Sequence, residues 1–581
     1  MPVDYDQIRE ENIRYYGEGD RHLFFLQELY DRRTHFVFEL LQNADDARAT
    51  EIEFVVHADR LDVVHNGRLF DEGDVRAICG IAESNKADED EKIGRFGIGF
   101  KSVYSYTDSP AVHSGDEHFR IEKYVRPVAT QSRAIRTGMT TLFSLPFNKD
   151  AISAEDAAAE LKSFFADRAQ FPSTVLLFLR HVEVVSWRTV GGSAGKIEAA
   201  SEQSGDDGRR VLLNRSDFRG SEHEVWLTFS KNLGALGYPK LSVQTAFQVG
   251  ERDGSPAILR LDRSPLAVFF PTAVETNLGF LVQGPYRTTP ARDNLVRDSE
   301  INTRIHEEVA ELVVQSAIGL RKRGWLDTEA LECFPLRPQD FPAESPFSVL
   351  FRTFREAVRH EPLIPTHGGG FGRGGLLRVS PSELLPDLFD GDRLEALLGT
   401  LEESGTRWVH TDVTPRRRPD LHAYLTRSIG DDVPLAPEMR AIQIVRQLDS
   451  DFMEAQSIDW TLRLYEFLDS QNEVVIRQTL ATREWVRCED GKCRAPSVED
   501  EPAVWLPPTT GGDVTYPIVA RALARDATVR RLMGRYDVTP RDEVDDILDT
   551  VIAYYREPDL RDEITGAENV EHVRRFLDAV A

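Results

Sequence analysis

Three polar side chains recur at helical spacing in the segment FELLQNADDA, residues 38–47. At 100° per residue, Glu39, Asn43 and Asp46 fall within roughly 60° of one another on a helix. They border an apolar stripe formed by Phe36, Leu40, Ala44 and Ala47. A carboxylate can act as a general base, and an amide oxygen can bind a hard cation. The helix carries side chains of both kinds.

A glycine-rich turn follows further along the chain, in the segment IGRFGIGFKSVYSYTD. Gly94, Gly97 and Gly99 allow the backbone to approach a ligand closely, and Phe100 begins an apolar helical stripe. A glycine turn that leads into a helix N-terminus is a suitable anion site. A P-loop is excluded, because Phe100 stands where its lysine should be and no strand precedes the turn. The three glycines alone leave an ordinary packing loop equally open.

The elements that must position these residues can be read from the intervening pattern. EIEFVVH, residues 51–57, and RLDVVH, residues 60–65, alternate with a period of two and predict adjacent strands. After an Asn66-Gly67 turn, DEGDVRAICGIA predicts a helix that is capped by Asp71. The acidic run ADEDEK, residues 87–92, predicts a solvated segment.

Length and composition limit the classes of protein. The chain has 581 residues, a formal net charge of −27 and a pI near 5.0. We expect about three or four domains, and neither autonomous nucleic-acid binding nor adsorption to a membrane surface. No apolar run reaches the roughly 18 residues that a membrane helix needs, and the first residues lack an apolar signal core. A cytoplasmic location is therefore expected.

The order of these parts resembles the GHKL ATPases, the superfamily of heat-shock-90 chaperones, MutL, gyrase B subunits and histidine kinases. The shared order is E-x-x-x-N-A-x-D, an N-G turn after a strand, and G-x-x-G-x-G-F. The blocks ELLQNADDA, NGRLFDEGDVRAICGI and IGRFGIGFKSVY look closest to the sacsin-like branch. The resemblance implies a GHKL α/β sandwich ATPase domain over residues 1–190 that uses ATP and Mg²⁺.

The resemblance also implies a role for each matching residue. Glu39 matches the general base that polarises the water attacking the γ-phosphate, and Asn43 matches the ligand of Mg²⁺. Asp46 matches a carboxylate of the nucleotide pocket. The other nucleotide contacts implied by the family are Ser84, Asn85 and Lys86 in a lid, Gly94, Gly97, Ile98, Gly99, Phe100 and Lys101 in the glycine turn, and Thr141 on a later strand.

One position departs from the family pattern. Most members carry D-x-G after the second strand, and the aspartate accepts from the exocyclic amine of adenine. This chain reads His65-Asn66-Gly67 instead. His65 or the amide of Asn66 could supply an acceptor, but neither carries the charge of a carboxylate. Selectivity for adenine is therefore open, and His65 could equally be an ordinary strand histidine.

The next part of the chain predicts a second domain. Residues 191–220 are rich in glycine, serine and charge, which predicts a surface loop or a boundary. The strand-like runs and long helix that follow resemble the S5-like α/β middle domain of heat-shock-90 and sacsin-like proteins, here over residues 191–335. Within GPYRTTPARDNL, Arg292 matches the catalytic-loop cation that reaches the γ-phosphate, with Arg287 as the alternative. A guanidinium suits the charge that develops in phosphoryl transfer.

Residues 336–581 predict a mainly helical region with two small β-hairpin units, one in residues 361–387 and one in residues 483–508. The expected fold class of the whole chain is therefore α+β. Three functions stay open. The first is a slowly hydrolysing, chaperone-like ATP clamp that acts on a client protein. The second is the ATPase subunit of a nucleic-acid-acting complex, such as a bacterial defence or repair system with a separate nuclease or helicase. The third is a nucleotide-binding scaffold without turnover. A homodimer through the N-terminal segment is a family-like expectation.

Overall fold

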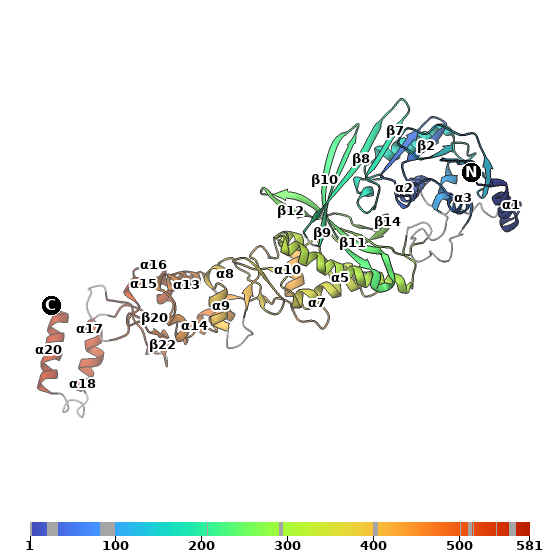
Figure 1. The fold of residues 1–581 in the computed structure, drawn as a ribbon. Coiled ribbons are helices and arrows are strands. Elements are labelled where there is room, and N and C mark those ends of the chain that lie inside the picture. The colour runs from blue at the N-terminus through green and yellow to red at the C-terminus, as the bar shows by residue number, and fades with distance from the viewer. Residues whose placement is uncertain are drawn as a thin grey trace. The chain divides into compact units, whose positions relative to one another are not determined.

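The computed structural model contains helices and one large mixed sheet, which confirms the α+β class (Figure 1). The chain divides into two compact units, residues 1–357 and residues 358–581. The structure describes residues 3–19, 33–81, 99–205, 207–289, 294–398, 405–499, 501–508, 514, 516–541, 543–556 and 565–580.

A fifteen-stranded sheet organises the first unit. Its strands are β1 (Glu51–Val56), β2 (Arg60–His65), β3 (Ala111–Ser114), β4 (Glu117–Glu122), β5 (Arg126–Ala129), β6 (Thr141–Pro146), β7 (Val184–Thr189), β8 (Ala194–Ser204), β9 (Gly208–Asp217), β10 (Gly220–Leu233), β11 (Tyr238–Arg252), β12 (Ser255–Leu259), β13 (Pro265–Val268), β14 (Phe270–Glu275) and β15 (Leu281–Gln283). Their order in the sheet is β14-β13-β15-β11-β10-β9-β8-β7-β1-β2-β6-β3-β4-β5, with β12 paired to β11. The sheet is therefore continuous across the first unit.

Helices pack on this sheet. Those of the first unit are α1 (Tyr5–Tyr16), α2 (Phe36–Asp46), α3 (Glu72–Cys79), α4 (Ala154–Ala166), α5 (Glu300–Lys322) and α6 (Thr328–Leu331), with short 3₁₀ turns that include η3 (Gly99–Ser105). The division between the units falls within α7 (Ser348–His360). Phe165 of α4 packs on Phe54 of β1, with ring centroids 5.3 Å apart. Alternate residues of a strand point to opposite sides, so β1 and β2 have a core face toward the helices and a polar face away from it.

The local patterns near the N-terminus are confirmed. β1 and β2 are adjacent and antiparallel, and Ile52 pairs with His65. Asp71 caps α3, because its carboxylate accepts from the N–H of Asp74 at 2.9 Å, while the carboxylate of Asp74 accepts from the N–H of Asp71 at 3.0 Å. This reciprocal capping box fixes where α3 begins.

The predicted surface loop at residues 191–220 is wrong. The segment forms β8 and β9, which pair from Lys196 opposite Ser216 to Ser204 opposite Gly208. Alanine, serine and charged residues give this ladder no clear apolar alternation, so the pairing partners and not local preference decide the structure. The expected domain boundary near residue 190 falls between β7 and β8, which also pair. The division at residues 190 and 335 stays a prediction.

The second unit is built from short helices and two-residue strands. The strands are β16 (Ile364–Pro365), β17 (Phe371–Gly372), β18 (Leu377–Arg378), β19 (Arg407–Trp408), β20 (Val486–Arg487), β21 (Cys493–Arg494), β22 (Ser497–Val498) and β23 (Glu501–Pro502). β16 pairs with β17, and β20 with β21, as antiparallel hairpins in the two stretches where hairpins are predicted. The helices are α8 (Leu384–Leu388), α9 (Gly391–Leu398), α10 (Pro419–Thr426), α11 (Ala441–Val445), α12 (Ser450–Glu454), α13 (Ile458–Ser470), α14 (Val474–Ala481), α15 (Arg521–Ala524), α16 (Ala527–Gly534), α17 (Glu543–Asp546), α18 (Ile552–Arg556) and α20 (Gly566–Val580).

The core of the second unit includes the buried rings of Trp408, Trp460, Tyr465 and Trp485. Trp485 lies edge-on to Tyr465, with ring centroids 5.2 Å apart, and the Tyr465 hydroxyl donates to the Trp485 carbonyl at 2.9 Å. Across the parts of both units that the structure describes, no helix combines the length and apolarity of a membrane span.

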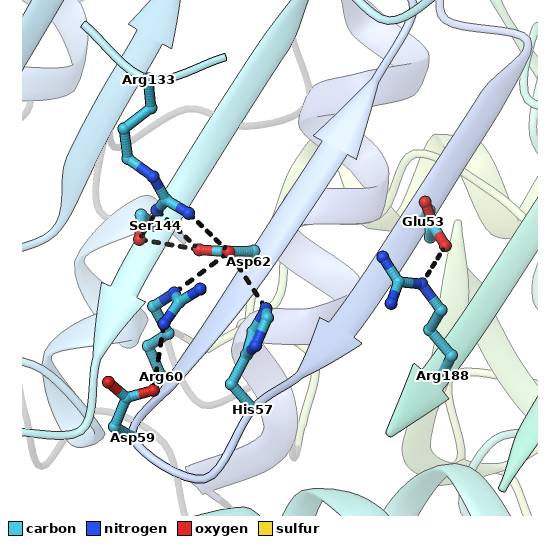
Figure 2. A network of polar contacts seen from close by, with 8 residues as sticks. All are labelled: Glu53, His57, Asp59, Arg60, Asp62, Arg133, Ser144 and Arg188. Atoms are coloured by element: carbon cyan, nitrogen blue, oxygen red, sulfur yellow. Dashed lines mark hydrogen bonds and ion pairs between the residues drawn. The ribbon is translucent and has the colours of Figure 1, made fainter. Parts of the chain in front are cut away.

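A network on the polar face joins β2 and β6 of the first unit (Figure 2). Arg133 donates to both carboxylate oxygens of Asp62, at 3.0 and 2.9 Å. Ser144 of β6 and Arg60 also donate to Asp62, at 2.8 and 3.1 Å. Burial raises the pKa of Asp62, but these bonds outweigh it and hold the pKa below its ordinary value. Asp62 therefore ties β2 to β6 and to the segment that precedes β6.

We expect Asp62→Ala to lower the free energy of unfolding by about 2 kcal/mol, because it removes several charge-assisted bonds from a buried carboxylate. Asp59→Ala is the matched control. Asp59 is 74% exposed and binds the same Arg60, so its removal should change stability by less than about 0.5 kcal/mol. Urea unfolding of the three proteins measures both changes. Equal losses in the two variants would contradict the role of Asp62.

Three buried histidines of the first unit give it a defined pH dependence. Burial lowers the pKa of His65, His113 and His306 to about 4. In the unfolded chain these three histidines take up a proton near pH 6.5, whereas in the folded chain their rings stay neutral until about pH 4. As the pH falls through this window, the free energy of unfolding should drop by about 1.4 kcal/mol per pH unit for each histidine. Urea unfolding at pH 6.5 and 5 tests this, and equal stability at both would contradict it.

Candidate functional site

Helix α2 lies between two glycine turns that approach it very closely. A Cβ on Gly99 would overlap Oε2 of Glu39, and a Cβ on Gly67 would lie 2.8 Å from the carbonyl oxygen of Ala47. Real Cβ atoms essentially never come within 3.0 Å of another heavy atom. At Gly67 the clashing atoms are the carbonyl oxygen and Cβ of Ala47, so only glycine fits there, whereas at Gly99 the clashing atom is the end of the Glu39 side chain, which would have to move. The structure therefore brings the predicted glutamate and the last glycine of the predicted turn into direct contact.

The carboxylate of Glu39 is held near the start of α2. Glu39 is 7% exposed, and Nε2 of His35 lies 3.4 Å from its Oε1. The i, i+4 spacing of these residues places them on one side of the helix start. His35 was not among the predicted site residues, although this spacing is visible in the sequence. The pair gives the site a buried carboxylate beside an imidazole.

The polar residues at the end of α2 separate into two groups. Asn43 and Asp46 are exposed, so their oxygens can reach a ligand or a cation. Asp45 is buried, and its carboxylate accepts from the backbone N–H groups of three residues, Arg180, His181 and Val182, at 2.7–3.2 Å. Asp45 therefore anchors the helix to the segment before β7, a role that the sequence pattern does not reveal.

A row of polar side chains crosses the core face of the sheet near the end of β2. His65 pairs with Thr141 of β6, which in turn pairs with Ser114 of β3. The hydroxyls of Thr141 and Ser114 are 2.7 Å apart. Nδ1 of His65 accepts from the N–H of Gly67 at 3.1 Å. The predicted contacts His65, Gly67 and Thr141 are thus neighbours in the structure.

The side chain of Asn66 stabilises the turn after β2. Its Oδ1 accepts from the N–H groups of Thr50 and Glu51, at 2.8 and 3.0 Å. Its Nδ2 donates to the hydroxyl of Thr50 at 2.8 Å. Because both acceptor positions of the amide oxygen are used, this side chain holds the turn against the start of β1 and offers no acceptor to a nucleotide base.

Lys101 and Phe100, which follow Gly99, are buried. The sequence predicts nucleotide contacts for both, but Nζ of Lys101 donates to the carbonyls of Ile78 and Tyr124, each at 2.6 Å. Burial lowers the pKa of this ammonium to about 8. The ring of Phe100 lies 5.8 Å from that of Phe143. Lys101 therefore ties η3 to α3 and does not face a phosphate in this structure.

Several predicted site residues fall outside the described part of the chain: Ser84, Asn85, Lys86, Gly94, Gly97, Ile98 and Arg292. Arg287, the alternative to Arg292, is exposed. The side chain of Asn302 in α5 accepts from the N–H of Arg287 at 2.8 Å and donates to the carbonyl of Arg287 at 2.9 Å, which fixes the backbone at residue 287. Within the ranges that the structure describes, no three His, Cys, Asp or Glu side chains form a metal-binding group.

We expect Lys101→Met to lower the midpoint of thermal unfolding by several degrees. The methionine removes a donor from two carbonyls, and leaving such buried groups unpaired costs about 1–3 kcal/mol each. Lys123→Met makes the same substitution at an exposed site nearby and should change stability by less than about 0.5 kcal/mol. Calorimetric scans of the three proteins compare the midpoints. A midpoint for Lys101→Met equal to that of the control would contradict the structural role.

Comparison with known proteins shows which proteins the chain is similar to. Residues 25–122 match the family model described as Sacsin domain. Protein NO VEIN of Arabidopsis thaliana is 25% identical over 325 residues, which cover 50% of this chain and 11% of that protein. Sacsin of Homo sapiens is 24% identical over 397 residues, which cover 51% of this chain and 9% of that protein. The chain thus corresponds to a small part of each curated relative.

Among solved structures, the N-terminal domain of a DNA repair protein aligns with 47% of this chain and 90% of its own length, at 12% identity and a TM-score of 0.29. The sequence comparisons support the sacsin-like resemblance at the level of distant homology. The chain contains a region similar to the Sacsin domain.

Proposed function

We propose that this protein binds a Mg²⁺-bound nucleoside triphosphate on α2 and hydrolyses it slowly, as in the GHKL ATPases that its motifs resemble. ATP is the nucleotide that the resemblance implies. The observation that carries the proposal is the contact of the Glu39 carboxylate with Gly99, where a Cβ would overlap the carboxylate. A side chain at residue 99 would therefore push this buried carboxylate aside. The similarity of residues 25–122 to the Sacsin domain supports the same proposal.

Glu39 acts as the general base in this proposal. Its carboxylate accepts the proton of the water that attacks the γ-phosphate. Because this carboxylate lies between His35 and Gly99, its orientation is restricted. Asn43, exposed one helical turn further on, offers its side-chain oxygen to Mg²⁺. The cation, when bound, neutralises charge on the phosphate oxygens.

Hydrolysis would reset a conformational clamp. In this proposal the triphosphate is bound more tightly in a closed state, in which Arg292 reaches the γ-phosphate. About 5.5 kcal/mol of differential binding carries such an equilibrium from 1:99 to 99:1. Asn302 binds both the N–H and the carbonyl of Arg287 and so fixes the backbone five residues before Arg292 in the sequence.

We expect Glu39→Ala to retain nucleotide binding and to lose at least about 10²-fold in the rate of phosphate release, since the base acts in the transition state and not in binding. Asn43→Ala should lose the Mg²⁺-dependent part of binding. Glu72→Gln is the control, because this carboxylate is exposed on α3 and outside the site. Calorimetry with and without Mg²⁺ measures binding, and a phosphate-release assay measures turnover.

Two results would reject the assignments. Turnover by Glu39→Ala at the wild-type rate would remove Glu39 as the base. Binding by Asn43→Ala that keeps its full dependence on Mg²⁺ would remove Asn43 as the cation ligand. Absence of any heat with saturating Mg²⁺ and ATP, GTP or ITP would reject the proposed function as a whole.

A further inference from the structure

The tautomer of His65 is set by a backbone group. His65 is 2% exposed, and its Nδ1 accepts the N–H of Gly67 at 3.1 Å. The ring is neutral at pH 7, because burial lowers its pKa to about 4. A neutral imidazole whose Nδ1 accepts a hydrogen bond carries its proton on Nε2. The remaining polar group of His65 is therefore a donor and not an acceptor.

This donor has no hydrogen-bond partner among the residues that the structure describes; the ring's hydrogen bond there is the one at Nδ1. Thr141 and Ser114, the other members of the row, bond to each other, and Asn66 in the adjoining turn is bound to Thr50 and Glu51. The Nε2–H of His65 is therefore a group for which a ligand can supply the acceptor.

The two ends of α2 place this donor relative to the proposed base. Glu39 contacts Gly99 near the start of the helix, and Ala47, just past its end, contacts Gly67. Eight residues of helix separate Glu39 from Ala47, or about 12 Å. His65 lies at the Ala47 end, because Gly67 binds its ring and packs on Ala47. A nucleotide that lies along α2 with its γ-phosphate at Glu39 would bring its base to the His65 end.

We propose that the site selects a 6-oxopurine nucleotide, such as that of guanine or hypoxanthine, over the 6-aminopurine nucleotide ATP. The inference rests on the proposed nucleotide site and specifies its base. The carbonyl at the purine 6-position accepts from Nε2–H of His65, whereas the amine of adenine would place one donor against another and leave both unpaired. Selectivity of this kind comes from a buried polar group that the wrong substrate leaves without a partner.

The experiment compares ATP, ITP and GTP on the full chain by calorimetry with Mg²⁺ at pH 7.5. ATP and ITP are the matched pair, because ITP carries the 6-carbonyl in place of the 6-amine. We expect ITP and GTP to bind at least about tenfold more tightly than ATP. His65→Asp supplies an acceptor and should reverse the order, with ATP tighter than ITP. His113→Asn is the control, because His113 is equally buried but points to the polar face of the sheet, and it should keep the wild-type order.

The outcomes separate the inference from the function on which it rests. ATP binding as tightly as ITP, or more tightly, in the wild-type protein overturns the base assignment and leaves nucleotide binding intact. An unchanged order in a folded His65→Asp variant overturns the role of His65. Binding of none of the three triphosphates overturns both the proposed function and this inference. The wild-type series decides the base preference even where a variant does not fold.

Discussion

The candidate site depends on the close packing of α2 between two backbone turns. Gly99 meets the side chain of Glu39 near the start of the helix, and Gly67 meets the backbone of Ala47 just past its end. A methyl group at Gly67 would force the helix and the turn apart, because it would meet the backbone of Ala47, whereas one at Gly99 would displace the Glu39 carboxylate. The geometry of the site is therefore a consequence of two missing side chains. The packing of α2 against Gly99 and Gly67 also sets the positions of the polar groups between them.

The same packing explains why adjacent acidic residues on α2 differ. Asp45 and Asp46 are separated by 100° around the helix, so a helix seated on the core buries one and exposes the other. Asp45 accepts N–H groups from residues 180–182, and each such bond to a charged acceptor is stronger than a neutral one. This anchor fixes the rotation of the helix about its axis. The rotation in turn decides that Glu39 faces Gly99 while Asn43 and Asp46 stay accessible.

Residues whose environment is local could be predicted from the sequence, and residues whose environment is assembled from distant segments could not. The strands β1 and β2, the Asp71 cap and the helix α5 follow from periodicity and capping. The meeting of Glu39 with Gly99 follows from the order of the motifs. Lys101 could not be placed, because its two carbonyl partners come from α3 and from Tyr124. The strands β8 and β9 were missed because their ladder, and not their composition, stabilises them.

The network on the polar face of the sheet supports the candidate site on the core face. A slip of one residue between β2 and β6 would turn His65 away from the core face and expose the apolar set of both strands. Asp62 opposes such a slip, because it pairs with Ser144 in the register that also sets His65 opposite Thr141. Arg133 strengthens this contact by binding both Asp62 and Ser144 (Figure 2). The network on one face therefore holds the register that the polar row on the opposite face requires.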